Sequence, residues 1–215
     1  MIKSTFNLEN KLIQEGYNSV IGIDEAGRGP LAGPVVACAC VLKIEEKILL
    51  GHPMSKWIRD SKTLSEKRRE KMYDFVIKHF HIGVGICDHK TVDRINILQA
   101  TYLAMKKAIN DLDNKINDKK IILVDGNKKI PNLSVRQVAI VNGDKKIKSI
   151  SAASIIAKVT RDRIMREVHK KYPQYNFSKH KGYGTKIHLD ALKKYGPCEI
   201  HRKSFAPVRL ILGRK

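Results

Sequence analysis

The chain has 215 residues, and its 42 Lys and Arg residues against 21 Asp and Glu residues give a formal net charge of +21. With 42% apolar residues it is too hydrophobic for a disordered basic tail, and its length suits one domain with at most an appendage. The positive excess favours a polyanionic partner, nucleic acid before an anionic membrane, although a lysine-rich proteome would produce the same excess.

Short apolar runs alternate with amphipathic segments, which predicts an α/β fold. Strands are expected at residues 20–24, 35–42, 82–86, 121–124 and 135–141. A capping box from Thr63 to Glu66 starts one helix, and an apolar stripe from Leu98 to Leu112 marks a second. Further helices are expected at 149–172 and 185–195. We expect a single domain over residues 1–215, with a core over about 18–168 and a helical C-terminal extension over about 169–215.

The N-terminal segment lacks the hydrophobic run and cleavage pattern of a signal peptide, and no stretch is as long as a transmembrane helix. Cys38 and Cys40 alternate within an apolar run and have no His/Cys group at zinc spacing beside them. We therefore interpret them as small buried apolar residues. These features predict a reduced, cytoplasmic protein with no membrane partner.

Two acidic residues stand at the ends of apolar runs. Asp24 and Asp125 each close a predicted strand, and neighbouring parallel strands would bring the two carboxylates together. Glu25 would point to the other face of a straight strand, but a bend at the following glycines would let both acids serve one site. Carboxylates without histidine or cysteine suit Mg²⁺ or Mn²⁺, and two such ions are a common device for phosphodiester cleavage. A helix cap at Asp24 and an ordinary turn at Asp125 are the structural alternatives.

Two glycine-rich loops are also candidates for function. Residues 27–34 lack the Lys and Ser/Thr of a phosphate-binding P-loop, so they let a backbone approach a ligand or simply make a tight connection. Tyr183 lies between two glycines and beside basic residues, where its ring can stack on a sugar or base or can anchor the tail to the core.

Eight stretches of the chain resemble ribonuclease HII, the bacterial type 2 ribonuclease H, in the order found in that family. They are IDEAGRGPLAGPVV (23–36), DSKTLS (60–65), DRINILQA (93–100), VDGN (124–127), GD (143–144), SAASIIAKVTRD (151–162), KGYGT (181–185) and HRKSF (201–205). The resemblance spans most of the chain, from about residue 20 to about residue 208.

The resemblance implies a ribonuclease H-like fold, with a mixed five-stranded sheet, flanking helices and a C-terminal helical extension. It implies four acidic residues that are catalytic and bind two Mn²⁺ or Mg²⁺ ions, namely Asp24, Glu25, Asp125 and Asp144. Asp162 is a rival for the fourth position, but within a helix an ion-paired surface role suits it better. The substrate contacts implied by the resemblance are Gly27, Arg28, Gly29, Lys62, Ser151, Lys158 and Tyr183, of which Tyr183 would sense the 2′-hydroxyl.

The implied reaction is hydrolysis on the 5′ side of a ribonucleotide, in an RNA–DNA hybrid or singly embedded in duplex DNA, leaving 3′-hydroxyl and 5′-phosphate ends. Three rivals stay open: a type 3 ribonuclease H, a non-catalytic nucleic-acid binder and a DNA-only nuclease such as a resolvase. The resemblance also implies a monomer. The C-terminal residues 210–215 are too few to decide whether a sliding-clamp-type partner binds.

Overall fold

The computed structural model describes residues 4–43, 49, 52–113, 116 and 119–213. A five-stranded sheet in the order β3-β2-β1-β4-β5 forms its centre. The strands are β1 (Ser19–Ala26), β2 (Val35–Leu42), β3 (Phe80–Cys87), β4 (Lys120–Asp125) and β5 (Arg136–Ile140). β1, β2 and β3 pair antiparallel, whereas β4 pairs parallel with both β1 and β5. The predicted mixed five-stranded α/β sheet is therefore confirmed.

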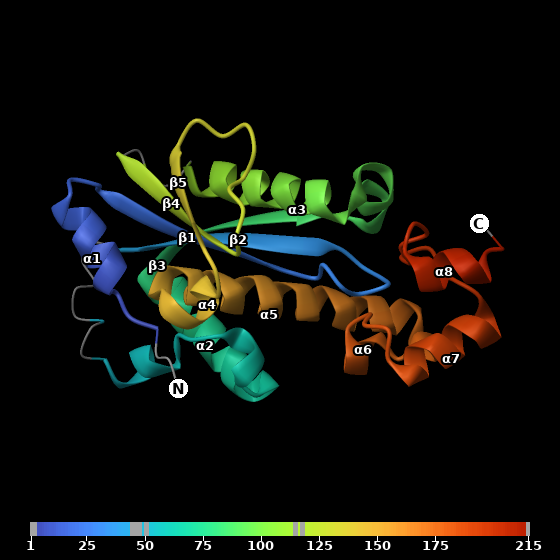
Figure 1. Cartoon of the computed structure of the whole chain (residues 1–215). Coiled ribbons are helices and arrows are strands. Elements are labelled where there is room, and N and C mark those ends of the chain that lie inside the picture. The colour runs from blue at the N-terminus through green and yellow to red at the C-terminus, as the bar shows by residue number, and fades with distance from the viewer. Residues whose placement is uncertain (1–3, 44–48, 50–51, 114–115, 117–118, 214–215) are drawn as a thin grey trace.

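Helices cover both faces of the sheet (Figure 1). The long helix α3 (His89–Asp113) lies on one face, and α5 (Lys148–Lys171) lies on the other with α2 (Glu66–His79) beside it. Side chains alternate along β1, so Ile21 and Ile23 join the core under α3. Gly22 and Asp24 thereby face the α5 layer. Asp24 is thus directed towards one defined side of the sheet.

Glycine lets both long helices approach the sheet closely. A Cβ atom on Gly22 would lie 2.2 Å from the carbonyl carbon of Ser149, at the start of α5. A Cβ atom on Gly85 would lie 1.9 Å from the carbonyl oxygen of Ala104 in α3. Because packed interiors leave no room for such overlap, larger residues would push the helices outward. The distance between α5 and the sheet therefore depends on Gly22.

The helix boundaries refine the sequence-based expectations. The helix predicted to be capped by Thr63 is capped two residues later, by Ser65, whose hydroxyl accepts the Arg68 N–H at 3.3 Å. Thr63 itself lies in a short 3₁₀ turn, η3 (Ser61–Thr63). The helix predicted from Leu98 is confirmed, although regular structure extends back to His89 across a kink at Asn96, whose φ is 64°. α1 (Asn7–Gln14) and α4 (Gly143–Lys146) were not predicted.

The C-terminal part forms short helices beyond the far end of α5 (Figure 1). They are α6 (Phe177–His180), α7 (Lys186–Tyr195) and α8 (Ala206–Ile211). Pro173 follows the end of α5, as predicted, and begins the 3₁₀ turn η4 (Pro173–Tyr175). Arg202 and Leu31 form a backbone hydrogen bond of 2.8 Å, which ties this part to the loop after β1. The C-terminal helices are thereby brought next to the loop that the sequence singled out.

Among the described residues, no helix is long and apolar enough to cross a membrane. Cys38, Cys40 and Cys87 are buried, as the apolar interpretation of Cys38 and Cys40 predicted. Cys198 is only half-buried and contacts the His201 ring, with Sγ and Nδ1 3.1 Å apart.

Candidate active site

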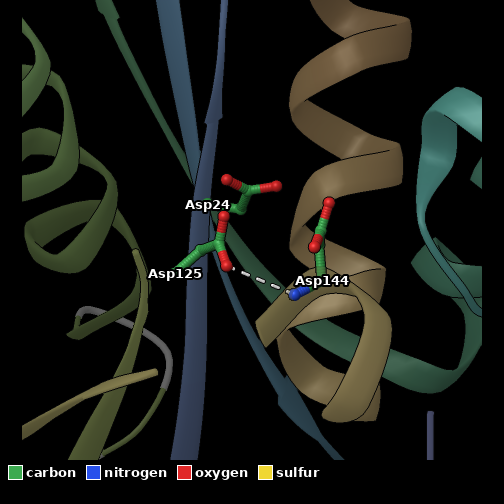
Figure 2. Close-up of side chains that lie close together, drawn as sticks. All are labelled: Asp24, Asp125 and Asp144. Carbon is green, nitrogen blue, oxygen red and sulfur yellow. Dashed lines mark hydrogen bonds between the residues drawn. The ribbon is translucent and has the colours of Figure 1, made fainter. Parts of the chain in front are cut away.

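Three carboxylates from distant parts of the chain meet at one edge of the sheet (Figure 2). Asp24 lies near the end of β1, Asp125 ends β4, and Asp144 lies in α4. Residue 23 pairs with residue 124 across the parallel strands, which sets Asp24 and Asp125 side by side. One ligand oxygen of each of the three lies within 4.8 Å of the others. The convergence expected of Asp24 and Asp125 is therefore confirmed, and Asp144 joins them.

Backbone hydrogen bonds fix Asp144 beside Asp125. The Asp125 Oδ1 atom accepts the Gly143 N–H at 2.7 Å and the Asp144 N–H at 3.3 Å, the latter drawn in Figure 2. These N–H groups open the short helix α4, where a carboxylate is a favourable acceptor. Asp125 therefore helps to place a second carboxylate.

The electrostatics of the group favour a bound cation. Burial, followed by the charges of Glu25 and Asp125, raises the pKa of Asp24 well above its usual range. Burial, with the charges of Asp125 and Asp60, also raises the pKa of Asp144. Like charges held this close are stabilised by a cation between them. Lys62 supplies one positive charge next to the group. Its Nζ atom lies 3.6 Å from Asp144 Oδ2, and its side chain is 77% exposed.

Glu25 lies beside this group but outside its compact part. β1 continues to Ala26, so the chain bends only after Glu25. It accepts a hydrogen bond from Arg28 Nη1 at 3.2 Å. Burial raises the pKa of Glu25, and the charge of Asp125 adds to the increase, so the two carboxylates interact electrostatically. Glu25 is therefore not part of the set of three acids whose ligand oxygens all lie within 4.8 Å of one another.

The donor set fits a divalent cation of the hard type. All three converging groups are carboxylates, and Asp24 and Asp144 are buried. Oxygen-only sites suit Mg²⁺ and Mn²⁺.

Two buried arginines hold the loop after β1. Arg161 and Arg202 are both 0% exposed, and they donate hydrogen bonds to backbone carbonyls. Arg161 reaches the carbonyls of Pro34, Ala32 and Lys181 at 2.9–3.0 Å, whereas Arg202 reaches those of Gly27, Arg28, Pro30 and Gly33 at 2.6–3.0 Å. Burial lowers the pKa of Arg161 to about 10 and that of Arg202 to about 9, so both stay charged at neutral pH. The loop carbonyls are therefore turned inward, towards positive charge.

The ring of Tyr183 borders the same loop. It is 43% exposed, and a Cβ atom on Gly29 would lie 3.7 Å from its Cε1 atom. The cations of Lys158 and Arg161 lie 5.9 and 6.0 Å from the ring centre. The structure thus brings Gly29 and Tyr183 together, next to Arg28, which donates a hydrogen bond to Glu25.

Three other residues named from the sequence have buried partners. Ser151 is 0% exposed and its hydroxyl faces the carbonyls of Asp144 and Ile147 at 2.7 and 2.9 Å, so it presents no surface to a nucleic acid and instead supports α4. Lys158 Nζ donates to Asp162 Oδ1 at 2.7 Å. Asp162 is ion-paired as expected, but it is only 3% exposed rather than on the surface. It lies outside the converging group of carboxylates.

Sequence reasoning missed the roles of Arg161 and Arg202. One signal was available for Arg161, which continues the i, i+4 row of Ala153 and Ala157 and precedes Met165 on it. A charged residue on an apolar helix row indicates a buried, fully hydrogen-bonded group. Arg202 follows no such row.

The comparisons with known proteins decide the family. The ribonuclease HII family profile matches residues 21–208 of the chain. The chain belongs to the ribonuclease HII family. A ribonuclease HII from Caldanaerobacter subterraneus subsp. tengcongensis is 54% identical over 92% of this chain and 78% of its own length. A ribonuclease HII from Caldicellulosiruptor bescii is also 54% identical, over 93% of this chain and 92% of its own length.

Solved structures of ribonucleases H have the same fold. Ribonuclease H2 from Pyrococcus horikoshii OT3 superposes with a TM-score of 0.69 at 29% identity, over 90% of this chain and 96% of that one. A Bst-RNase HIII in complex with Mn²⁺ gives a TM-score of 0.73 at 19% identity, over 94% of this chain and 71% of that one, and shows the fold alone. Members of the ribonuclease HII family are endonucleases that act on nucleic acid with divalent metal ions. This chain is such a ribonuclease H.

Proposed function

We propose that the enzyme hydrolyses the phosphodiester bond on the 5′ side of a ribonucleotide, both in RNA–DNA hybrids and at single ribonucleotides in duplex DNA. The observation that carries the proposal is the convergence of Asp24, Asp125 and Asp144 within 4.8 Å in a chain of this family. The products would carry 3′-hydroxyl and 5′-phosphate ends.

Asp24, Glu25, Asp125 and Asp144 would hold two Mn²⁺ or Mg²⁺ ions. Such ions, when bound, supply water activation at neutral pH and neutralise charge on the leaving oxygen. The chain's own residues position the reactants. Asp125 orders α4 through its backbone hydrogen bonds, and Lys62, exposed beside Asp144, offers a cation to a substrate phosphate.

Selectivity would come from the two loops that meet at Gly29 and Tyr183. Because Arg202 occupies the carbonyls of Gly27 and Arg28, the opposite edge of this loop backbone, with its N–H groups, is left to face a phosphate or a 2′-hydroxyl. The half-exposed Tyr183 ring offers a stacking surface at the same place. Lys158 would contribute charge beneath that ring.

A duplex with one embedded ribonucleotide tests the proposal. It is incubated beside an all-DNA duplex with Mn²⁺, Mg²⁺ or chelator, using the wild type and Asp125→Asn, whose Oδ1 atom keeps the backbone hydrogen bonds. Metal-dependent cleavage 5′ to the ribonucleotide, lost in the variant, is expected, with ends that a polymerase extends and a ligase joins. Cleavage of long hybrids alone, or of an all-DNA four-way junction, would contradict the proposal.

Three further expectations belong to this proposal. A monomer is expected, and size-exclusion chromatography with light scattering tests it. A solved complex of PCNA and RNase HII from Archaeoglobus fulgidus, 24% identical with a TM-score of 0.69, holds a clamp partner for that protein. For this chain a clamp-type partner remains a prediction, tested by binding to purified clamp. The buried cysteines are compatible with the expected cytoplasmic, reducing compartment.

A further inference from the structure

A cluster of cations surrounds the single tryptophan of the chain. Trp57 ends the 3₁₀ turn η2 (Pro53–Trp57) and is half-buried. The guanidinium carbons of Arg68 and Arg59 lie 3.9 and 5.0 Å from its ring centre, and Lys56 Nζ lies 5.6 Å from it. We call these four residues the Trp57 patch.

None of the three cations of the Trp57 patch has a carboxylate partner among the residues that the structure describes. The buried Nε atom of Arg59 also lacks a hydrogen-bond partner. Elsewhere, Arg163 and Arg166 are paired with Glu70, and Arg166 also reaches Glu66 Oε1 at 2.7 Å. The chain therefore neutralises arginines between α2 and α5 but leaves those around Trp57 uncompensated.

The Trp57 patch is fixed to the core on the Asp144 side of the active site. Ile58 is 0% exposed, and Lys148 Nζ donates to the carbonyls of Ser55 and Ile58 at 2.6 and 2.9 Å. Lys148 begins α5, directly after the helix that carries Asp144. The patch is therefore held by the same structural unit as one of the catalytic acids.

The distance along the chain to the active site is short. Arg59 precedes Lys62 by three residues, and three residues span at most about 11 Å between Cα atoms. Lys62 Nζ is itself 3.6 Å from Asp144 Oδ2. Successive phosphates of one strand rise by about 3.4 Å along a DNA axis. A phosphate within roughly three steps of the one at Lys62 therefore comes within reach of the Trp57 patch.

We propose that the Trp57 patch binds the phosphate backbone of the substrate duplex beside the cleaved bond. The proposal rests on the proposed function, because it assigns a second contact to the same substrate. Stacking on the indole uses the face of a guanidinium and leaves its N–H edge to pair with phosphate oxygens. Because Arg59 and Arg68 already lie against the ring, they lose less side-chain freedom when they bind. Uncompensated positive charge selects a polyanion over an apolar partner.

Salt-dependent binding tests the patch. Fluorescence anisotropy gives the Kd of Asp125→Asn for a labelled ribonucleotide-containing duplex between 50 and 200 mM salt, with and without the additional changes Arg59→Ala and Arg68→Ala. The slope of log K against log salt is negative, and each lost phosphate contact makes it less steep by about 0.9, so the slope of the patch variant should be less steep by about 1.8. Between 50 and 200 mM salt, the loss of affinity of the patch variant should therefore be about 12-fold smaller than that of its parent.

The matched control is Arg163→Ala with Arg166→Ala in the same background. It removes the same charge, but from arginines that are already paired with glutamates. Its slope should change by less than about 0.5 if local contacts rather than net charge matter. Thermal melts verify that both variants are folded. Equal slopes for the patch variant and its parent, or equal losses in patch and control variants, would overturn the proposal.

Two further measurements separate this inference from the proposed function. With Asp125 intact, the patch variant should raise KM for cleavage and keep kcat. Trimming the duplex on one side should abolish the difference between patch variant and wild type once the contacted phosphates are gone. A difference that persists on duplexes trimmed from either side contradicts the proposal. Failure of the wild type to cut at ribonucleotides would refute the proposed function, whereas the binding slopes would still report on the patch.

Discussion

The Nε2 atoms of His188 and His201 lie 3.0 Å apart inside the C-terminal part of the protein, and only one arrangement of ring protons satisfies both rings. His201 Nδ1 accepts the Cys198 N–H at 2.9 Å, so His201 carries its proton on Nε2 and donates it to His188. His188 then carries its proton on Nδ1 and donates it to the Tyr183 carbonyl at 2.9 Å. This relay holds the backbone of Tyr183 through two neutral histidines.

Acid should therefore destabilise the protein through this pair. Burial lowers the pKa of both His188 and His201 from 6.5 to about 4. The unfolded chain binds protons between pH 6.5 and 4 that the folded chain excludes, so the stability present above 6.5 is lost as the pH falls towards 4. Each proton excluded over this window corresponds to about 3 kcal/mol.

Urea unfolding of wild type and His201→Gln between pH 7.5 and 4.5 measures this effect. The variant should be less stable at pH 7.5, because the relay is broken, and its free energy of unfolding should depend less on pH. His81→Gln, at a partly exposed position on β3, is the control and should keep the wild-type dependence. Parallel curves for wild type and His201→Gln would exclude the histidine pair as the source.

Gly27 should not tolerate alanine. Its φ is 98°, and a Cβ atom would lie 2.1 Å from Arg161 Nε, which is itself held by the Pro34 carbonyl. We expect Gly27→Ala to lower the free energy of unfolding by about 3 kcal/mol or more and to reduce cleavage, because the loop must move. Gly16 is a matched control, since its φ is 90° but the nearest atom to a Cβ is Lys119 Nζ at 3.7 Å. Gly16→Ala should therefore lose only about 1 kcal/mol. Equal losses at the two positions would show that the contact with Arg161 is unimportant.

The sheet and its main helices were predictable because their causes are local. Short apolar runs mark β1 and β4, and their parallel pairing was the condition under which Asp24 and Asp125 would meet. The compact group of three acids was only partly predictable. Asp144 reaches Asp125 through hydrogen bonds to backbone N–H groups at the start of α4, a four-residue helix that no periodicity reveals. Arg202 likewise acquires its role from carbonyls about 170 residues earlier in the chain, which sequence spacing does not indicate.

Asparagine substitutions should distinguish Asp144 from its rival Asp162. Asp162 is paired with Lys158 at 2.7 Å and with Arg69 at 3.9 Å, so Asp162→Asn leaves two cations without their partner and should lower stability by about 3 kcal/mol. Cleavage should persist within about tenfold at a temperature where the variant is folded. Asp144→Asn should have the opposite effects on stability and on cleavage. It relieves repulsion with Asp125, so metal-free stability should rise by about 1 kcal/mol, while cleavage is lost. Chemical unfolding and cleavage assays on both variants give the four values, and loss of cleavage in Asp162→Asn alone would reverse the assignment.

Divalent metal should stabilise the folded enzyme, because it offsets repulsion among Asp24, Asp125 and Asp144, which is absent when the chain unfolds. An ion present at 100 times its Kd should add about 2.7 kcal/mol, seen as a rise in Tm when Mn²⁺ or Mg²⁺ is titrated into chelator-treated protein. Asp125→Asn should lose most of this rise, whereas Asp162→Asn, altered outside the converging group, should keep it. An equal rise in Tm in wild type and Asp125→Asn would place the stabilising metal elsewhere on the protein. No rise in the Tm of the wild type would show that the three carboxylates do not bind the ion at these concentrations.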